Sequence, residues 1–147
     1  MKLFTIGFTQ KKAQCFFGLI REHEIELLVD IRLNHKSQLA GFAKGDDLPF
    51  FLSALCSCDY QHCPEFAPDK ETLSDYRAKR ITWETYTERF LALMEERSAH
   101  DLFWEHFANL ERLCLLCSEP TPEHCHRRLV AELAAVDAPV DVEIVHL

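Results

Sequence analysis

Arg112-Leu-Cys-Leu-Leu-Cys117 is the apolar stretch that decides the fold of this chain, and Ser118-Glu-Pro-Thr-Pro-Glu-His-Cys-His-Arg-Arg128 follows it directly. A short apolar run bounded by proline and polar residues is typical of a buried strand. Thr121-Pro122-Glu123 then predicts a helix start, because a hydroxyl suits the N-cap, proline the first helical position and an acid the first turn. A strand that passes into a helix in this way indicates an α/β fold, in which ligands bind at the carboxyl edge of the sheet.

The rest of the chain repeats this alternation of strands and helices. Segments 3–6 and 25–31 predict two further strands, and weaker strands are expected near Tyr60 and over 140–144. Apolar residues at helical spacing predict helices over 13–20, 48–55, 71–79, 82–93, 102–110 and 129–133. We therefore expect one α/β domain over residues 1–147, with a three-layer, mostly parallel sheet of four or five strands and helices on both faces.

The composition limits the class of protein. Of 147 residues, 48% are apolar and 27% charged, which is ordinary for a globular protein. No stretch approaches the roughly 18–20 apolar residues of a membrane span, and the N-terminal apolar run is too short for a secretory signal. Seven cysteines without an export signal indicate reduced thiols and a cytoplasmic location. The net charge of −8 predicts no bulk binding to nucleic acid, and no membrane partner is expected.

Polar residues follow three of the predicted strands. Because the carboxyl ends of parallel strands meet at one edge of a sheet, we expect these side chains to lie close together. Residues 31–45 contain three cations and no acid, and two arginines follow His126. The arginine fork and a helix N-terminus both suit phosphate or carboxylate. The predicted partner is therefore an anionic small-molecule ligand, with structural ion pairs as the alternative; its binding residues are Gly7, Thr9, Arg32, Ser118 and Arg127.

Titratable groups near the same edge are the candidates for catalysis. Glu119 and His126 suit an acid/base pair, and Asp30 is a further carboxylate. Cys125 is a candidate nucleophile, because a helix N-terminus and neighbouring cations lower the pKa of a thiol. The alternative for both Cys117 and Cys125 is a buried apolar residue, and it is the preferred interpretation of Cys117. A cysteine-phosphatase loop is excluded, because position 123, six residues after Cys117, is Glu and not Arg. The predicted catalytic set is Glu119, Asp30, Cys125 and His126.

Two groups of residues have the chemistry of metal ligands. Cys114 and Cys117 lie three positions apart, so on a strand they point to opposite faces and do not bind one ion. Cys117, Cys125 and His126 share a centre only if the intervening loop folds back. The second group lacks the two separated pairs of a zinc ribbon; it consists of Cys56, Cys58, His62 and Cys63. We assign no metal ligand and no cofactor from the sequence, and a metal at either group stays an alternative.

Motifs along nearly the whole chain form a recognisable set: Thr5-Ile6-Gly7, Leu28-Val29-Asp30-Ile31-Arg32, Tyr60 with His62-Cys63-Pro64-Glu65, Leu115-Leu116-Cys117-Ser118-Glu119, and Cys125-His126-Arg127. On these motifs the chain resembles the Domain of Unknown Function 488 family, and C-x-E followed by C-H-R is the most specific part. The resemblance implies a compact α/β fold and a site built from the segments above, without a reaction. The chain departs from the pattern at Phe8 and Thr9, where His and Ser are usual, and at His35, where Pro is usual.

These observations support two functions. The first is an enzyme that acts on a phosphate-bearing, nucleotide-like small molecule or on a nucleic-acid end. In that enzyme Arg32 and Arg127 hold the anion, Glu119 or Asp30 transfers protons, and Cys125 or His126 assists. The second is a non-catalytic module that binds or senses a nucleotide or another anion. The aromatic residues over 83–107 are interpreted as core in both cases, and the oligomeric state does not follow from the sequence.

Overall fold

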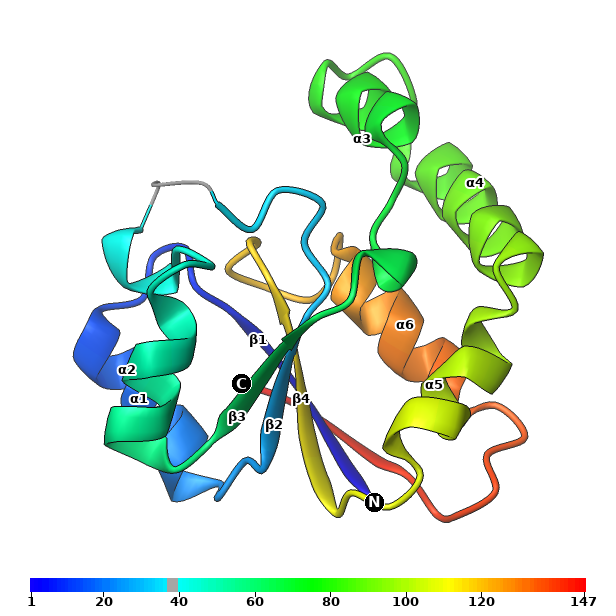
Figure 1. The fold of residues 1–147 in the computed structure, drawn as a ribbon. Coiled ribbons are helices and arrows are strands. Elements are labelled where there is room, and N and C mark those ends of the chain that lie inside the picture. Colours follow the sequence, from blue (N-terminus) through cyan, green and yellow to red (C-terminus); the bar gives the residue numbers. More distant parts are fainter. Residues whose placement is uncertain (37–39) are drawn as a thin grey trace.

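A computed structural model of the protein describes residues 1–36 and 40–147, and these residues form a five-stranded parallel sheet (Figure 1). The strand order is β3-β2-β4-β1-β5, and each neighbouring pair is parallel. The strands are β1 (Lys2–Gly7), β2 (Leu27–Asp30), β3 (Asp59–His62), β4 (Arg112–Cys117) and β5 (Glu143–His146). The predicted α/β class is thus confirmed.

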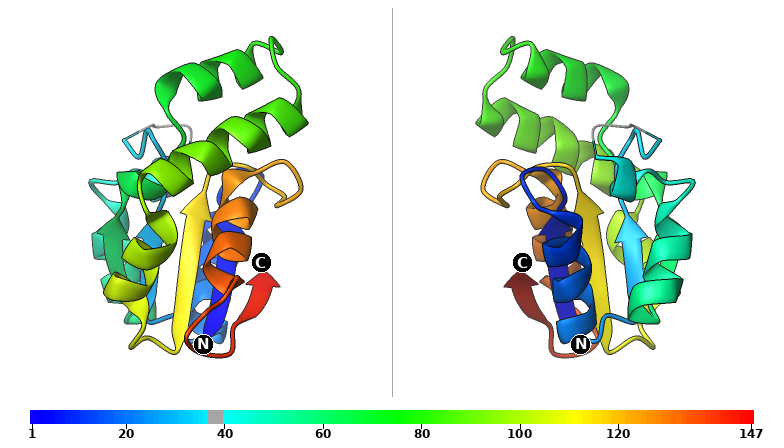
Figure 2. Two further views of the ribbon diagram at one scale, coloured as in Figure 1. Left: turned by 90° about the vertical axis from the view of Figure 1, so that its right-hand side faces the viewer. Right: turned by 90° about the vertical axis from the view of Figure 1, so that its left-hand side faces the viewer.

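Helices cover both faces of the sheet, as predicted (Figure 2). On one face lie α1 (Ala13–Glu22) and α2 (Leu48–Cys56), and on the other α4 (Trp83–Glu96), α5 (Ala99–Phe107) and α6 (His126–Ala135). The remaining helix, α3 (Lys70–Arg77), precedes α4, and two short 3-10 turns span Gly41–Ala43 and Pro64–Phe66. None of the helices among the described residues combines the length and apolarity needed to cross a bilayer.

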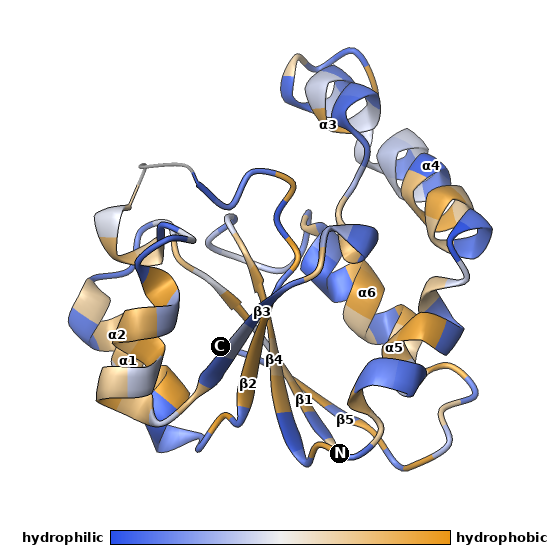
Figure 3. Ribbon diagram, in the orientation of Figure 1, coloured by the Kyte–Doolittle hydropathy of each residue, from blue (hydrophilic) through white to orange (hydrophobic). Residues whose placement is uncertain are grey.

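The central strand β4 divides the core between the two faces. Leu113 and Leu115 pack with α4, α5 and α6, whereas Cys114 and Leu116 pack with α1 and α2. Both sides of β4 are therefore apolar, as expected of a parallel strand covered on both faces (Figure 3). This alternation also places Cys117 on the face opposite to Cys114, as the sequence predicts.

Two predicted boundaries are wrong. The last helix begins at His126 and not at the Thr121-Pro122 signal, which lies in the loop after β4. This loop forms bends and a turn in place of a helix, because the chain passes the end of β1 before α6 packs on the sheet. The last strand begins at Glu143 and not at Val140, since Glu143 pairs with Lys2, the first residue of β1. It is an edge strand, as predicted.

Helices α3 and α4 form a hairpin that extends beyond the carboxyl edge of the sheet (Figures 1 and 2). Asp69 caps α3 by accepting the Thr72 N–H at 2.7 Å, and Thr82 caps α4 by accepting the Thr85 N–H at 3.2 Å. Asp75 of α3 pairs with Arg89 of α4 at 3.0 Å and with Arg80 of the connecting turn at 2.8 Å. The hairpin thus has its own stabilising contacts while it overhangs the strand ends.

Gly7 lies where the loop after β4 comes closest to β1. It is opposite Cys117 in the β1–β4 register. A β-carbon at Gly7 would overlap the carbonyl oxygen of Glu119 and come within 3.1 Å of the Arg127 guanidinium. Only glycine therefore allows the loop over 118–125 to pass so close to the end of β1.

We expect Gly7→Ala to lower the free energy of unfolding by about 1–3 kcal/mol, which is the usual cost of forcing an extra carbon into a well-packed site. Gly18→Ala in α1 is the matched control, because nothing lies within 4 Å of the added carbon. That change should be neutral or should stabilise the helix by up to about 1 kcal/mol. Urea denaturation of both variants measures the difference, and equal midpoints would contradict the close approach.

Candidate functional site

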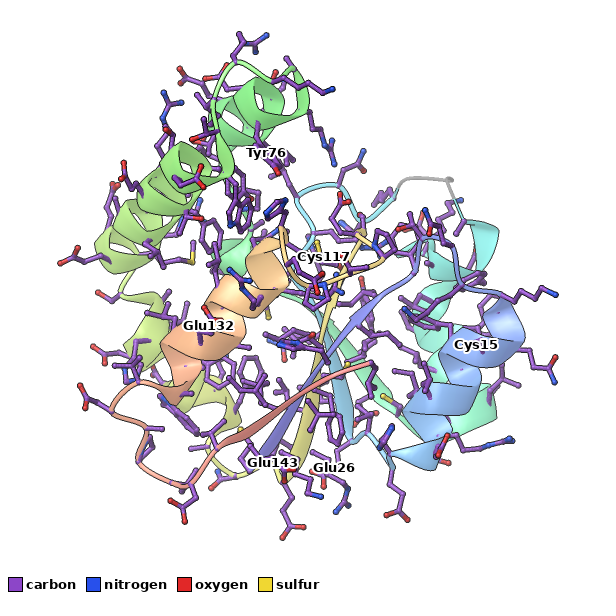
Figure 4. All side chains as sticks on the ribbon, turned by 180° about the vertical axis from the view of Figure 1, so that it is seen from behind. Cys15, Glu26, Tyr76, Cys117, Glu132 and Glu143 are labelled. Atoms are coloured by element: carbon purple, nitrogen blue, oxygen red, sulfur yellow. The ribbon has the colours of Figure 1, made fainter. Side chains whose placement is uncertain are left out.

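A pocket of ≈ 490 Å³ lies at the carboxyl edge of the sheet, beneath the α3–α4 hairpin. Figure 4 shows Tyr76 of α3 above this edge and Cys117 at the end of β4. A cavity of this volume suits a small molecule. The lining comes from the loop after β2, helices α3 and α4, and the segment from β4 to α6; it includes Arg32, Tyr76, Arg77, Lys79, Trp83, Tyr86, Cys117, Ser118, Glu119, His124, Cys125 and His126.

Two thiols and an imidazole meet in the lining of this pocket. Cys117 ends β4, Cys125 is the N-cap of α6 and His126 is its first residue. Their ligand atoms all lie within 4.8 Å of one another, and the Cys117 sulfur is 3.6 Å from His126 Nδ1. All three side chains are buried. The loop after β4 does fold back, so the condition set by the sequence for a common centre is met.

The two thiols of this cluster have opposite pKa shifts. Cys117 has a lowered pKa, because the Cys125 thiol donates a hydrogen bond to its sulfur. Burial acts in the opposite direction, whereas backbone N–H groups and the Arg127 charge lower the pKa of Cys117 further. Cys125 has a raised pKa, because its hydrogen is held by Cys117 and because it is buried. The pair therefore releases one proton readily and keeps the second.

Arg32 forms a buried ion pair with Asp30. Its Nε lies 2.8 Å from Asp30 Oδ1 and its Nη2 2.5 Å from Oδ2, and Nη2 also donates to the Ala43 carbonyl at 2.8 Å. The Tyr60 hydroxyl donates to Asp30 Oδ2 at 2.8 Å. Burial, and then the charge and hydrogen bond of Asp30, raise the pKa of Tyr60. Arg32 also lines the pocket, and its Nη1 has no hydrogen-bond partner among the described residues.

Arg127 is completely buried and is not among the residues that line the pocket. Its Nη1 donates to the Glu119 carbonyl at 2.6 Å and to the Cys125 sulfur at 3.4 Å. Its Nε donates to the Thr5 hydroxyl at 3.3 Å. One guanidinium thus holds together β1, the loop after β4 and the first turn of α6.

The other predicted site residues divide into two groups. Ser118 and Glu119 line the pocket, and the Glu119 side chain is exposed, with no hydrogen bond or ion pair to any described residue. Gly7 and Thr9 lie outside the lining; Thr9 donates both its N–H and its hydroxyl to the Ser118 carbonyl. Gly7 and Thr9 therefore support the loop that carries Ser118 and Glu119.

The basic stretch predicted over 31–45 is partly neutralised. Lys36 and Lys44 both lie near Asp46, at 3.7 and 4.0 Å, just beyond the range that the sequence pattern covers. Residues 37–39 of this stretch lie outside the described residues. Of its three cations, Arg32 lines the pocket, and Lys36 and Lys44 do not.

Sequence reasoning missed the contribution of the α3–α4 hairpin. Arg77 and Lys79 line the pocket, as do Tyr76, Trp83 and Tyr86. The Trp83 and Tyr86 rings stack with centroids 5.0 Å apart, and the centroids of the His124 and Trp83 rings are 5.2 Å apart. Trp83 and Tyr86 were predicted as core, and they do pack against the core while also lining the pocket. A sequence signal for this part of the pocket was present, since Trp83 and Tyr86 closely follow the cations Arg77, Lys79 and Arg80.

The second predicted ligand group does not assemble. Cys58 packs on the α1–α2 face and Cys63 on the face of α4, α5 and α6. Burial raises the pKa of each thiol to about 12. Across residues 1–36 and 40–147, Cys117, Cys125 and His126 are the one group of three or more ligand-type side chains whose atoms converge.

Comparison with known proteins gives one match. A family model described as "Domain of unknown function DUF488" matches residues 12–134, which is most of the chain. No curated protein and no solved structure gives a significant match. The matched range contains the Asp30–Arg32 pair, the pocket and the thiol–imidazole cluster.

We expect Asp30→Asn to lower the free energy of unfolding by about 3–5 kcal/mol, because it leaves the buried Arg32 charge without its partner. Asp75→Asn is the matched control, since Asp75 also pairs with arginine but at the protein surface, where ion pairs contribute little. Chemical denaturation measures the free energy of unfolding of both variants, and an unchanged m-value shows that the change lies in stability alone. A loss no larger than that of the control would show that the buried pair does not hold the edge together.

Proposed function

Because the chain belongs to the family described as domain of unknown function DUF488, whose description assigns no reaction, we propose a function from the pocket itself. We propose that the protein is an enzyme that acts on a phosphate-bearing, nucleotide-like small molecule. The observation that carries the proposal is the combination of aromatic rings, cations and reactive groups around one pocket of ≈ 490 Å³. Its volume is within the range of small-molecule sites.

The aromatic wall supports a planar ring in the ligand. Tyr76, Trp83 and Tyr86 lie with centroids 5.0–5.6 Å apart, and His124 extends the wall at 5.2 Å from Trp83. Trp83 is only partly buried, so a face of the wall is accessible to a ligand. A nucleobase stacks on such a surface with a gain of about 1–3 kcal/mol.

The cations of the lining support an anionic group. Arg77 and Lys79 are exposed at the rim and make no ion pair with the described residues, since Asp75 is occupied by Arg80 and Arg89. Arg32 contributes its unpartnered Nη1. A buried donor without an acceptor costs about 1–3 kcal/mol, so an anionic oxygen near Nη1 would recover this loss. Because Asp30 neutralises Arg32, Arg77 and Lys79 supply the net positive charge.

Three further residues of the lining carry reactive groups. Glu119 is the proposed proton donor or acceptor, because its carboxylate is exposed at the lining and engages no described residue. Cys125 and His126 belong to the cluster with Cys117 and form the proposed reacting centre. Asp30 has a positioning role in this proposal, since Arg32 and Tyr60 occupy both its oxygens.

Binding is tested first, with a nucleoside monophosphate and the matching nucleoside that lacks phosphate. We expect saturable quenching of Trp83 fluorescence by the phosphate form, because Trp83 lines the pocket while Trp104 is buried against Ala134. Arg77→Gln and Lys79→Gln should each weaken binding by about tenfold, or ~1.4 kcal/mol. Lys70→Gln is the matched control, since Lys70 is exposed on α3 outside the lining. Equal affinity of both ligands, or no binding by a panel of nucleotides, would refute the anion site.

Turnover separates an enzyme from a binding module. We expect the wild type to convert a member of a nucleotide panel, and Glu119→Gln to lower kcat by about 100-fold or more while leaving KM nearly unchanged. Glu123→Gln is the control, because Glu123 is an exposed acid of the same loop outside the lining. Saturable binding without turnover in the wild type would favour the sensor module.

A further inference from the structure

We propose that Cys117, Cys125 and His126 bind a zinc ion whose fourth coordination position faces the pocket. The sequence alone assigns no metal, and nothing in the family description implies one. This inference goes beyond the proposed function, and it holds or fails independently of the molecule that the pocket binds. It rests on the distances within the cluster, the hydrogen bond of the imidazole, the neighbouring donor and the position of the cluster in the pocket.

The distances match a tetrahedral zinc site. With Zn–S near 2.3 Å and Zn–N near 2.0 Å, the sulfur–nitrogen edge of such a tetrahedron is about 3.5 Å. Cys117 Sγ lies 3.6 Å from His126 Nδ1. The Cys125 sulfur is within 4.8 Å of the Cys117 sulfur and of a ring nitrogen of His126, so side-chain rotations would bring all three ligand atoms to one ion.

The imidazole makes the hydrogen bond that a metal-bound histidine typically makes. His126 Nε2 lies 2.9 Å from the carbonyl oxygen of Ile31, which can only accept a hydrogen. Nε2 therefore carries the proton and Nδ1 has the free lone pair. The Cys117 sulfur lies 3.6 Å from Nδ1 and 3.7 Å from Nε2, so the ring must turn before Nδ1 points at an ion shared with Cys117. A histidine ligand typically donates its second ring N–H to a carbonyl or carboxylate in this manner.

One donor beside the cluster partly offsets the raised pKa of Cys125, whose proton a bound ion would have to displace. Arg127 Nη1 donates to Cys125 Sγ at 3.4 Å, and its bond to the Glu119 carbonyl at 2.6 Å fixes its position. Two buried thiolates are unfavourable without a cation, and a divalent ion neutralises both. The C-H-R motif thus supplies two ligands and the arginine that supports one of them.

The number and position of ligands point to an open site. Among the described residues, three ligand-type side chains converge here, and all three line the pocket. Structural zinc sites have four protein ligands, whereas catalytic sites have three and leave a position for water or substrate. Two thiolates and one imidazole suit zinc by their softness. At the open position the ion would polarise an anionic oxygen or a water molecule.

Metal content of the full chain tests the site directly. The protein is expressed with zinc in the medium, purified with a reductant and without chelator, and its metal is measured by plasma mass spectrometry. We expect one zinc ion per chain in the wild type, and only a small fraction of that in Cys117→Ser and Cys125→Ser. Cys63→Ser is the matched control, because Cys63 is buried on the same face outside the cluster, and it should retain the ion.

Cobalt titration of the metal-depleted wild type keeps the test valid if the serine variants fail to fold. We expect the visible absorption of tetrahedral cobalt with a thiolate charge-transfer band, and protection of two of the seven thiols from a thiol reagent. Three outcomes would overturn the proposal: no metal uptake by the reduced wild type, full occupancy in both serine variants, or a Cys117–Cys125 disulfide in place of the ion. Metal binding without nucleotide binding would refute the proposed function and leave this inference standing.

Discussion

The carboxyl edge of this protein depends on the buried guanidinium of Arg127. Its hydrogen bonds to Thr5, to the Glu119 carbonyl and to Cys125 connect β1, the loop after β4 and α6. These neutral acceptors bind Nε and Nη1, whereas Nη2 has no hydrogen-bond partner and the charge no ion pair among the described residues. The three bonds therefore matter greatly, because a buried charge without partners is strongly destabilising. The bonds in turn fix the path of the loop, and the absence of a β-carbon at Gly7 makes that path possible. The convergence of two thiols and an imidazole is a consequence of this arrangement.

A second buried group sets the electrostatics of the pocket. Asp30 and Arg32 neutralise each other at the end of β2, so the inner part of the lining has little net charge from this pair. The unpaired positive charge lies instead on Arg77 and Lys79, at the rim formed by the α3–α4 hairpin. Glu119 adds an unpaired carboxylate to the lining, so the positive charge of the pocket is concentrated at Arg77 and Lys79. In the proposed function these two residues attract the anion, and the aromatic wall packs against the planar ring.

Much of the architecture could be predicted because its signals are local. The continuous apolar runs of β2 and β4 indicate strands covered on both faces, and the helical spacing of Phe16, Phe17 and Ile20 indicates α1. The start of α6 could not be predicted in this way. Thr121-Pro122 is a sound local signal for a helix, and it is overridden because the loop after β4 must first cross the end of β1. Local preference is a weak term when a tertiary contact opposes it.

The α/β class and the segments that contribute to the candidate site follow from the amino-acid sequence, since strand ends of a parallel sheet meet at one edge whatever their order. The packing of the elements against one another settles which side chains of those segments face the pocket. It turned Arg127 inward to bond the backbone, paired Arg32 with Asp30, and brought Cys117 to His126 across nine positions of chain. It also added the hairpin residues Tyr76 and Arg77 to the pocket. The reason is physical: periodicity within one element shows which side chains share a face, whereas the group that each of them meets depends on packing between elements.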